Sequence, residues 1–333
     1  MKFDVIIGNP PYQLPDGGAQ ASAAPLYNYF IDGAKSLSPK YIDMIIPSRW
    51  MTGGKGLDSF RDEMIHDNRM LVLHDYASSK EIFPGVDIKG GVCFFLWDST
   101  HNDVCKCYRH DLNGIYRTNR YLCEEGDDIF IREGRLIDIK NKVQALGEPS
   151  VAGIVSARKP YGLAADTMRN ATKYNLPEFS DTPIENGYKI LGLGDKQKRT
   201  WKYIPKDYPL PKTAGIDKYK IFISEAYGCG NIGEVPSTPV LGTPAEICTE
   251  TFLQIGPFDT KELAENFLTY LKTKFFRALV SIKKQTQHTT SKVYQYVPMQ
   301  NFSKPWNDKE LYIKYGLSQE EIDFIESSIK PME

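Results

Sequence analysis

The first hundred residues alternate short apolar runs with amphipathic stretches. Residues 3–7 form a β-branched run that stops at Gly8-Asn9-Pro10-Pro11, which predicts a strand closed by a rigid turn. Further buried strands are predicted at 41–47, 70–74 and 91–97, and helices around 25–37 and 57–65. Strands that alternate with helices predict crossover connections, and therefore an α/β fold with a largely parallel sheet.

The residue composition and the pattern of predicted elements change near residue 147, which indicates a second domain. Leu136, Ile139, Val143 and Leu146 repeat with helical spacing, and Gly147 is a good helix stop. We therefore expect domains at 1–147 and 148–333. The second one reads as mixed α+β, rich in loops.

Two helices are predicted late in the second domain. One runs from 261 to about 282 and is capped by Asp259 or Thr260. The other follows a capping box of Ser318 and Glu321.

Composition narrows the class of protein. The 333 residues carry 41 basic and 42 acidic groups, with 41% hydrophobic residues, as in ordinary globular proteins. No apolar stretch is long enough for a membrane span or a secretory signal, so we expect a cytoplasmic protein without membrane partners. The six cysteines show no metal-site spacing, and we expect no metal. Residues 151–220 hold 13 basic and 7 acidic groups, a local excess typical of nucleic-acid contact or of a solvated charged face.

The stretch Asn9-Pro10-Pro11-Tyr12 carries the chemical signal. It directly follows the first predicted strand, which places it at the carboxyl edge of the sheet, where open α/β folds bind ligands. The stretch resembles motif IV of the amino-methyltransferases that use S-adenosylmethionine. Its form with Asn and Tyr is typical of adenine-N6 DNA methyltransferases.

That resemblance implies roles for three residues. The Asn9 side-chain oxygen and the Pro10 carbonyl would each accept one N–H of the target amine, which frees the nitrogen lone pair to attack the sulfonium methyl. Two prolines fix the backbone so that the Pro10 carbonyl points outward. Tyr12 would stack on a flipped-out base. The catalytic candidates are thus Asn9, Pro10 and Tyr12.

The resemblance continues along the first domain. Residues 41–51, ending in Ser48-Arg49-Trp50-Met51, look like the next strand of these enzymes, and residues 81–92 look like motif VIII. There Phe83 would stack on the base opposite Tyr12, although a plain core position is the alternative. The run from Gly90 to Asp98 is similar to type IIG restriction–modification methylases. In these, one polypeptide can combine cleavage, methylation and target recognition, and the second domain here fits their target-recognition domain.

The sequence departs from the family pattern at the cofactor site. In enzymes of this order a glycine-rich turn and an acidic residue precede motif IV, which here begins at residue 3. Gly192-Leu193-Gly194-Asp195 lacks the Asp-Pro and the β-α context of such a turn. We therefore expect a C-terminal fragment with the second half of a Rossmann-like methyltransferase sheet, followed by the recognition domain.

The expected lack of the N-terminal half of the catalytic domain has consequences for activity, cofactor binding and partners. The fragment would be inactive alone and would bind S-adenosyl-L-methionine weakly or not at all. Its partners would be double-stranded DNA and the N-terminal catalytic half or nuclease part. The unpaired edge of residues 3–7 would self-associate, or residues 1–12 would be mobile.

The DNA contacts are expected in the second domain. Basic side chains suit phosphates and glutamines suit adenine edges. The candidates are Arg158, Lys159, Lys198, Arg199, Lys283, Lys284, Gln285, Gln287 and Lys292.

Methylation of cytosine N4 in DNA stays open, although Asn9 favours adenine N6. Two further alternatives to DNA methylation also stay open. Methyltransferases that act on RNA or on a protein glutamine also carry Asn-Pro-Pro-Tyr. A third reading takes the chain as a DNA-recognition module that is inactive alone.

Overall fold

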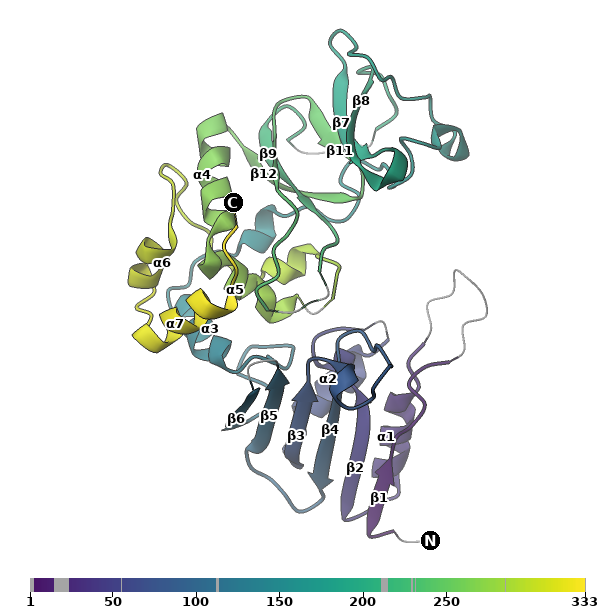
Figure 1. The fold of residues 1–333 in the computed structure, drawn as a ribbon, viewed down its shortest axis with the longest axis vertical. Coiled ribbons are helices and arrows are strands. Elements are labelled where there is room, and N and C mark those ends of the chain that lie inside the picture. Colours follow the sequence, from purple (N-terminus) through teal and green to yellow (C-terminus); the bar gives the residue numbers. More distant parts are fainter. Residues whose placement is uncertain are drawn as a thin grey trace. The chain divides into compact units, whose positions relative to one another are not determined.

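The chain folds into two compact units, Met1–Ile137 and Asp138–Glu333 (Figure 1). The computed structural model describes residues 3–14, 24–54, 56–111, 114–210, 215–228, 230, 232–284 and 286–332. The division falls within helix α3 (Arg135–Gln144), ten residues before the position expected from the sequence. The second half of this helix belongs to the C-terminal unit, where Lys142 Nζ lies 2.6 Å from Glu321 Oε2.

The N-terminal unit contains a six-stranded sheet in the order β1-β2-β4-β3-β5-β6. Its strands are β1 (Val5–Gly8), β2 (Tyr41–Pro47), β3 (Met70–Tyr76), β4 (Val92–Asp98), β5 (Cys105–Asp111) and β6 (Gly114–Arg120). The α/β class is confirmed. The expected largely parallel pairing is wrong, since only β1–β2 and β3–β5 pair in parallel. A loop, and no crossover helix, joins β3 to β4, and such a link yields antiparallel neighbours.

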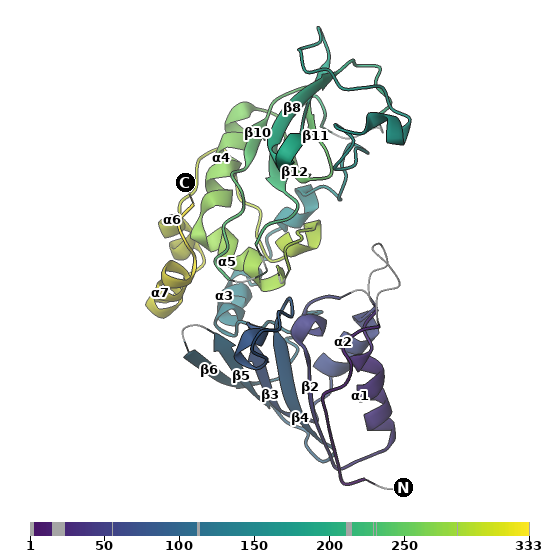
Figure 2. The ribbon, with the colours of Figure 1, turned by 45° about the vertical axis from the view of Figure 1, so that its right-hand side comes forward.

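One face of this sheet carries the core of the unit. Helices α1 (Tyr27–Ser36) and α2 (Asp58–Ile65) pack on it, and the 3-10 turn η1 (Ser48–Met51) follows β2 (Figure 2). Ile31 of α1 and Phe60 of α2 belong to the same buried cluster as the strand residues Ile42, Leu73 and Phe95. The α1 and α2 helices thus cover the same face.

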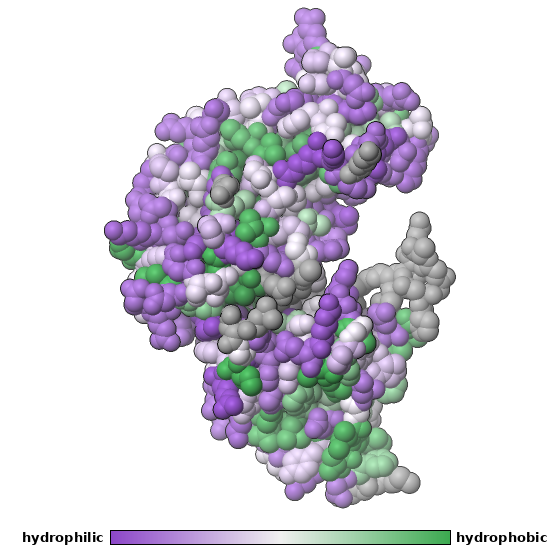
Figure 3. Space-filling view, in the orientation of Figure 1, coloured by the Kyte–Doolittle hydropathy of each residue, from purple (hydrophilic) through white to green (hydrophobic). Residues whose placement is uncertain are grey.

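The opposite face of the sheet, here called the open face, is apolar and aromatic. Alternate strand residues point there and are half-buried or exposed, and green hydrophobic surface gathers over these strands in Figure 3. They include Ile45, Val72, His74, Tyr76, Phe94, Leu96, Tyr108 and His110. β1 forms an edge of the sheet, and its Val5 and Ile7 are 48% and 76% exposed. An unpaired edge at residues 3–7 therefore agrees with the sequence; self-association there stays a prediction.

In its described residues, the C-terminal unit holds two small sheets and four α-helices after α3. One sheet has the order β10-β9-β12 and the other β11-β7-β8. The strands are β7 (Tyr188–Leu193), β8 (Arg199–Ile204), β9 (Tyr219–Ser224), β10 (Val240–Gly242), β11 (Glu246–Cys248) and β12 (Phe252–Phe258). The helices are α4 (Lys261–Lys272), α5 (Lys274–Lys283), α6 (Asp308–Lys314) and α7 (Gln319–Ser328). None of the helices in the described ranges is long and apolar enough to cross a membrane.

The single helix expected at 261–282 is wrong, because it breaks at Thr273. Thr273 is extended, with ψ 150°, and its side chain caps α5 by accepting from the Phe276 amide. The carboxylate of Asp308 also accepts from the amides of Lys274 and Phe275. Thr260 caps α4, and the capping box of Ser318 and Glu321 is present.

Candidate active site

Asn9 lies where the sequence placed it, just past the carboxyl end of β1. β1 pairs in parallel with β2, so Asn9 and Pro47 reach the same edge of the sheet. Both line a cavity of about 830 Å³ in the N-terminal unit, together with Pro10, Tyr12 and Phe83. The structure therefore brings together all four residues that the sequence singled out in this domain.

The two proposed acceptors of a base amine are both free. Asn9 is exposed, and its carboxamide makes no hydrogen bond to any described residue. Pro10 is buried, yet in the described part of the chain no amide donates to its carbonyl. Two consecutive residues thus carry an amide oxygen and a carbonyl oxygen without a partner in the described part of the chain, which suits a ligand that donates two N–H bonds.

Tyr12 offers the cavity a neutral ring. Its backbone carbonyl accepts from the Leu26 amide at 3.1 Å, so the residue is tied to the start of α1. Its hydroxyl is buried and has no hydrogen-bond partner among the residues described. Burial, helped by the nearby Cys93 thiol, raises the pKa of Tyr12 to about 12. The side chain therefore stays uncharged at any physiological pH and can serve as a stacking surface.

Phe83 stands on a loop between η2 (Ser79–Glu81) and β4, here called the Phe83 loop (residues 82–91). The buried Ser79 hydroxyl ties the loop together, because it donates to Val86 O and accepts from the Ile88 amide, both at 2.8 Å. Phe83 is half-buried on the cavity, whereas Phe95 is fully buried in the core. The position suits a stacking wall better than a core residue.

Replacing Ser79 by alanine should lower the free energy of unfolding by about 1–3 kcal/mol, because two part-buried hydrogen bonds to the backbone are lost. Thermal and urea unfolding of the full chain would measure this. Ser78→Ala is the matched control: the Ser78 side chain caps nothing, and the expected change is below about 0.5 kcal/mol. Equal losses in the two variants would contradict the assigned role of Ser79.

Two cations in the cavity lining were missed as candidates. Arg49 from η1 and Lys89 from the Phe83 loop both line the cavity, are exposed, and have no ion pair with a described residue. Arg49 stood inside the stretch that resembled the family's second strand, but nothing in one sequence separates a cavity cation from an ordinary surface one.

The glycine-rich string of the C-terminal unit serves packing. An added Cβ at Gly192 would lie 2.1 Å from Met168 Sδ, and one at Gly194 would lie 2.5 Å from Thr200 Oγ1. β7 turns directly into the antiparallel β8 there. A β-hairpin of this kind is unlike the β-α turn that cradles a cofactor. In the described ranges no group of three or more His, Cys, Asp or Glu side chains could hold a metal ion.

The candidate DNA contacts of the C-terminal unit fall into different settings. Lys159, Lys198, Gln287 and Lys292 are exposed. Arg158 is also exposed, with its Nε 3.8 Å from Glu250 Oε2 and 4.0 Å from Glu225 Oε1. Glu225 also binds His288 at 2.9 Å, and His288 is within 3.2 Å of the Gln287 amide. Arg158 and His288 therefore share the carboxylate of Glu225, and Gln287 is linked to it only through His288.

The side chains of three further candidates already bind other groups of the same chain. Lys284 is 3% exposed and lies 2.8 Å from Glu234, so it is not placed for a phosphate contact. Arg199 donates to Thr238 O and to Ser237 Oγ at 2.6 Å. Lys283 lies 2.6 Å from Gln295 Oε1. Sequence cannot separate a paired cation from a free one, since these partners are distant in the chain. Gln285 lies outside the described residues.

The segment of the chain that carries the cavity residues is similar to a known protein family. Residues 1–83 match the family model described as Eco57I restriction-modification methylase. That range contains Asn9, Pro10, Tyr12 and Phe83. The matches support a restriction–modification methylase. A protein of Mycoplasma pneumoniae (strain ATCC 29342 / M129 / Subtype 1), described as an uncharacterized adenine-specific methylase, is 40% identical over 104 residues, which cover 30% of this chain and 25% of that protein.

Solved structures show distant likenesses. The type IIG restriction endonuclease BpuSI is 12% identical with a TM-score of 0.39, over 95% of this chain and 49% of that one. The type IIL restriction-modification enzyme MmeI, solved in complex with DNA, is 11% identical with a TM-score of 0.48, over 87% of this chain and 46% of that one. The chain spans about half the length of these structures and matches a quarter of the curated relative.

Proposed function

We propose that this chain is the part of an adenine-specific DNA methyltransferase of a restriction–modification system that holds the target base. The observation that carries the proposal is the cavity at the end of β1, where free oxygens of Asn9 and Pro10 lie with the rings of Tyr12 and Phe83. The family match over residues 1–83 and the curated methylase relative support the same function.

The chain's own residues account for the handling of the amine. The flipped adenine lies between the rings of Tyr12 and Phe83. Asn9 Oδ1 and the Pro10 carbonyl each accept one N–H of the exocyclic nitrogen. This draws the nitrogen toward tetrahedral geometry and localises its lone pair. S-adenosylmethionine supplies the electrophilic methyl group when it is bound.

The groups that hold the cofactor come, in this proposal, from a second polypeptide region, the cofactor-supplying half. It pairs with the edge of β1 and covers the open face, whose exposed and half-buried side chains are largely apolar and aromatic. The exposed Val5 and Ile7 support that assignment. The chain alone is then inactive and binds S-adenosylmethionine weakly. The reaction belongs in the cytoplasm, with cellular DNA as substrate.

Transfer of labelled methyl groups tests the substrate class. The chain, together with its cofactor-supplying half, is incubated with labelled S-adenosylmethionine and with duplex DNA, RNA or protein extract. Label should enter DNA alone. Label in RNA or in protein glutamine would replace the proposal with one of the alternatives.

The C-terminal unit is proposed to recognise the DNA target, with Lys159, Lys198 and Lys292 on phosphates. Changing all three to glutamine should reduce the slope of log affinity against log salt by about 3, since each phosphate contact contributes about 0.9. Fluorescence anisotropy with a duplex at several salt concentrations measures the slope.

A matched triple variant controls for lost charge. Lys218, Lys261 and Lys304 each lie within 2.9 Å of a carboxylate of the chain. Their change to glutamine should leave the salt slope within about 0.5. The phosphate assignment fails if both triple variants shift the slope equally.

A further inference from the structure

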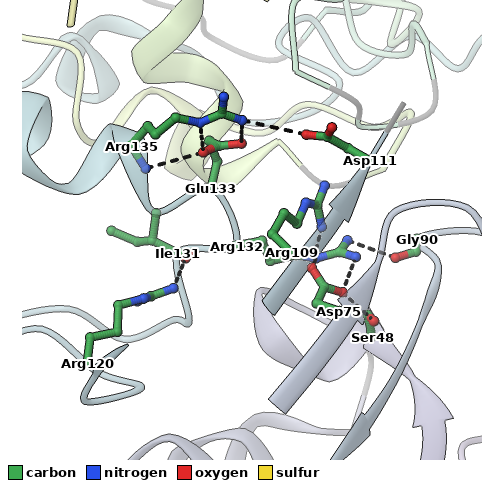
Figure 4. A network of polar contacts seen from close by, with 10 residues as sticks. All are labelled: Ser48, Asp75, Gly90, Arg109, Asp111, Arg120, Ile131, Arg132, Glu133 and Arg135. Carbon is green, nitrogen blue, oxygen red and sulfur yellow. Dashed lines mark hydrogen bonds and ion pairs between the residues drawn. The ribbon is translucent and has the colours of Figure 1, made fainter. Parts of the chain in front are cut away.

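A buried ionic network lies behind the cavity and centres on Asp75, at the end of β3. This carboxylate is 2% exposed and accepts from Arg132 Nε at 2.8 Å, from Arg132 Nη2 at 2.5 Å and from Ser48 Oγ at 2.8 Å. Arg109 binds the same carboxylate (Figure 4). Burial alone would raise the pKa of Asp75, but Arg132 and Arg109 hold it well below its usual range. The group is therefore a permanent anion.

The network reaches both walls of the cavity. Ser48 begins η1, the wall that carries Arg49. Arg132 Nη1 donates to Gly90 O at 2.8 Å, at the end of the Phe83 loop. The Ser48 amide donates to Gly91 O at 3.1 Å, so the two walls also meet directly.

Gly91, at the end of the Phe83 loop, lies in close contact with the backbone at the end of β3. It has φ +81°, and a Cβ there would lie 2.0 Å from Tyr76 O and 2.9 Å from Ala77 O. The loop backbone thus presses against the end of β3, which also carries Asp75. The hydrogen bond from Arg132 to Gly90 O fixes the residue next to this close contact.

Arg132 itself belongs to the segment between β6 and α3. Within two residues of it, the Phe130 amide donates to Met51 O at 2.8 Å, and Ile131 O accepts from Arg120. One short stretch therefore touches η1 through Met51 and the Phe83 loop through Gly90.

We propose that Arg132 is a positioning residue, which fixes the Phe83 loop against η1 and thereby sets the position of Phe83 for stacking on the base. The part of this inference that concerns the base rests on the proposed function. The part that concerns the walls rests on the hydrogen bonds of Arg132 to Gly90 and Asp75, and on that of Ser48 to Asp75. Arg132 touches no reacting atom; it acts through Gly90 directly and through Asp75 on Ser48.

The chain offers a matched pair of variants. Arg132→Lys keeps a positive charge beside Asp75, but one ammonium cannot hold both carboxylate oxygens and Gly90 O as the guanidinium fork does. Arg109→Lys perturbs the same carboxylate, and the described hydrogen bonds of Arg109 include none to either wall. Both substitutions keep the positive charge, and thermal unfolding of the full chain checks that both variants fold.

Hydrogen exchange followed by mass spectrometry tests the walls without any ligand. Peptides that cover residues 82–91 should exchange about tenfold faster in Arg132→Lys than in the wild type, because a hydrogen bond to a charged group is lost. Arg109→Lys should stay within about twofold of the wild type. Unchanged exchange in Arg132→Lys, or equal acceleration in both variants, would overturn the positioning role.

A base analogue separates this inference from the proposed function. A duplex with 2-aminopurine at the target position should lose fluorescence when the base stacks in the cavity, and Arg132→Lys should lessen this quenching while Arg109→Lys keeps it. Equal quenching in both variants would contradict the link to base binding. Absent quenching in the wild type would contradict the proposed function, while hydrogen exchange would still decide the role of Arg132.

Discussion

Asn9→Ala is expected to lower methyl transfer by about 10²–10³-fold, because the lost hydrogen bond is made most strongly when the amine approaches tetrahedral geometry. DNA affinity should change little, since most of it comes from phosphate contacts. Initial rates with duplex DNA, measured with the chain and its cofactor-supplying half, give the comparison.

The control for Asn9 is a second carboxamide at the other end of the sheet. Asn68 is exposed and lies just before β3, whose carboxyl end is at Tyr76. Because β1 and β3 run in the same direction, Asn68 and Asn9 lie at opposite edges. Asn68→Ala should keep its rate within about twofold of the wild type. A rate for Asn9→Ala that matches this control would exclude Asn9 from the chemistry.

Loss of either aromatic wall is expected to have the second largest effect. Stacking on an aromatic ring contributes about 1–3 kcal/mol per base, so Tyr12→Ala and Phe83→Ala should each weaken binding of the flipped base by roughly 5- to 150-fold. The quenching of 2-aminopurine against protein concentration reports that affinity, and the KM for duplex DNA should rise with it.

Tyr12→Phe distinguishes the ring from the hydroxyl. The hydroxyl of Tyr12 is buried and has no partner within the described residues, so its removal should retain base affinity within about threefold. A loss as large as that of Tyr12→Ala would mean that the hydroxyl, and not the ring face, contacts the ligand.

The local elements of the fold were predictable from apolar periodicity, whereas their pairing was not. The runs at β2, β3 and β4 are clear in the sequence, but the place of β4 between β2 and β3 follows from tertiary contacts. The break at Thr273 was hidden because Phe275 and Leu279 continue the helical period across it. Local pattern says little about a cap that depends on Asp308, more than thirty residues away.

At the candidate site, too, residues of a local motif were predictable from the sequence, whereas contacts between distant residues were not. Asn9 and Tyr12 were predictable because their motif is contiguous, and Phe83 because a family resemblance brought it in. The Asp75–Arg132 pair spans 57 residues, and nothing in either local sequence indicates that the two side chains are buried together. Likewise Lys284 reads as a surface cation until Glu234, 50 residues away, is seen beside it.

Nucleoside analysis of DNA tests the central claim most directly. Plasmid DNA is recovered from cells that produce this chain with its cofactor-supplying half, digested to nucleosides and analysed by mass spectrometry. We predict N6-methyl-2′-deoxyadenosine with the wild-type chain and its absence with Asn9→Ala. The account would be contradicted by N4-methyl-2′-deoxycytidine in its place, or by N6-methyl-2′-deoxyadenosine that persists at the wild-type level with Asn9→Ala.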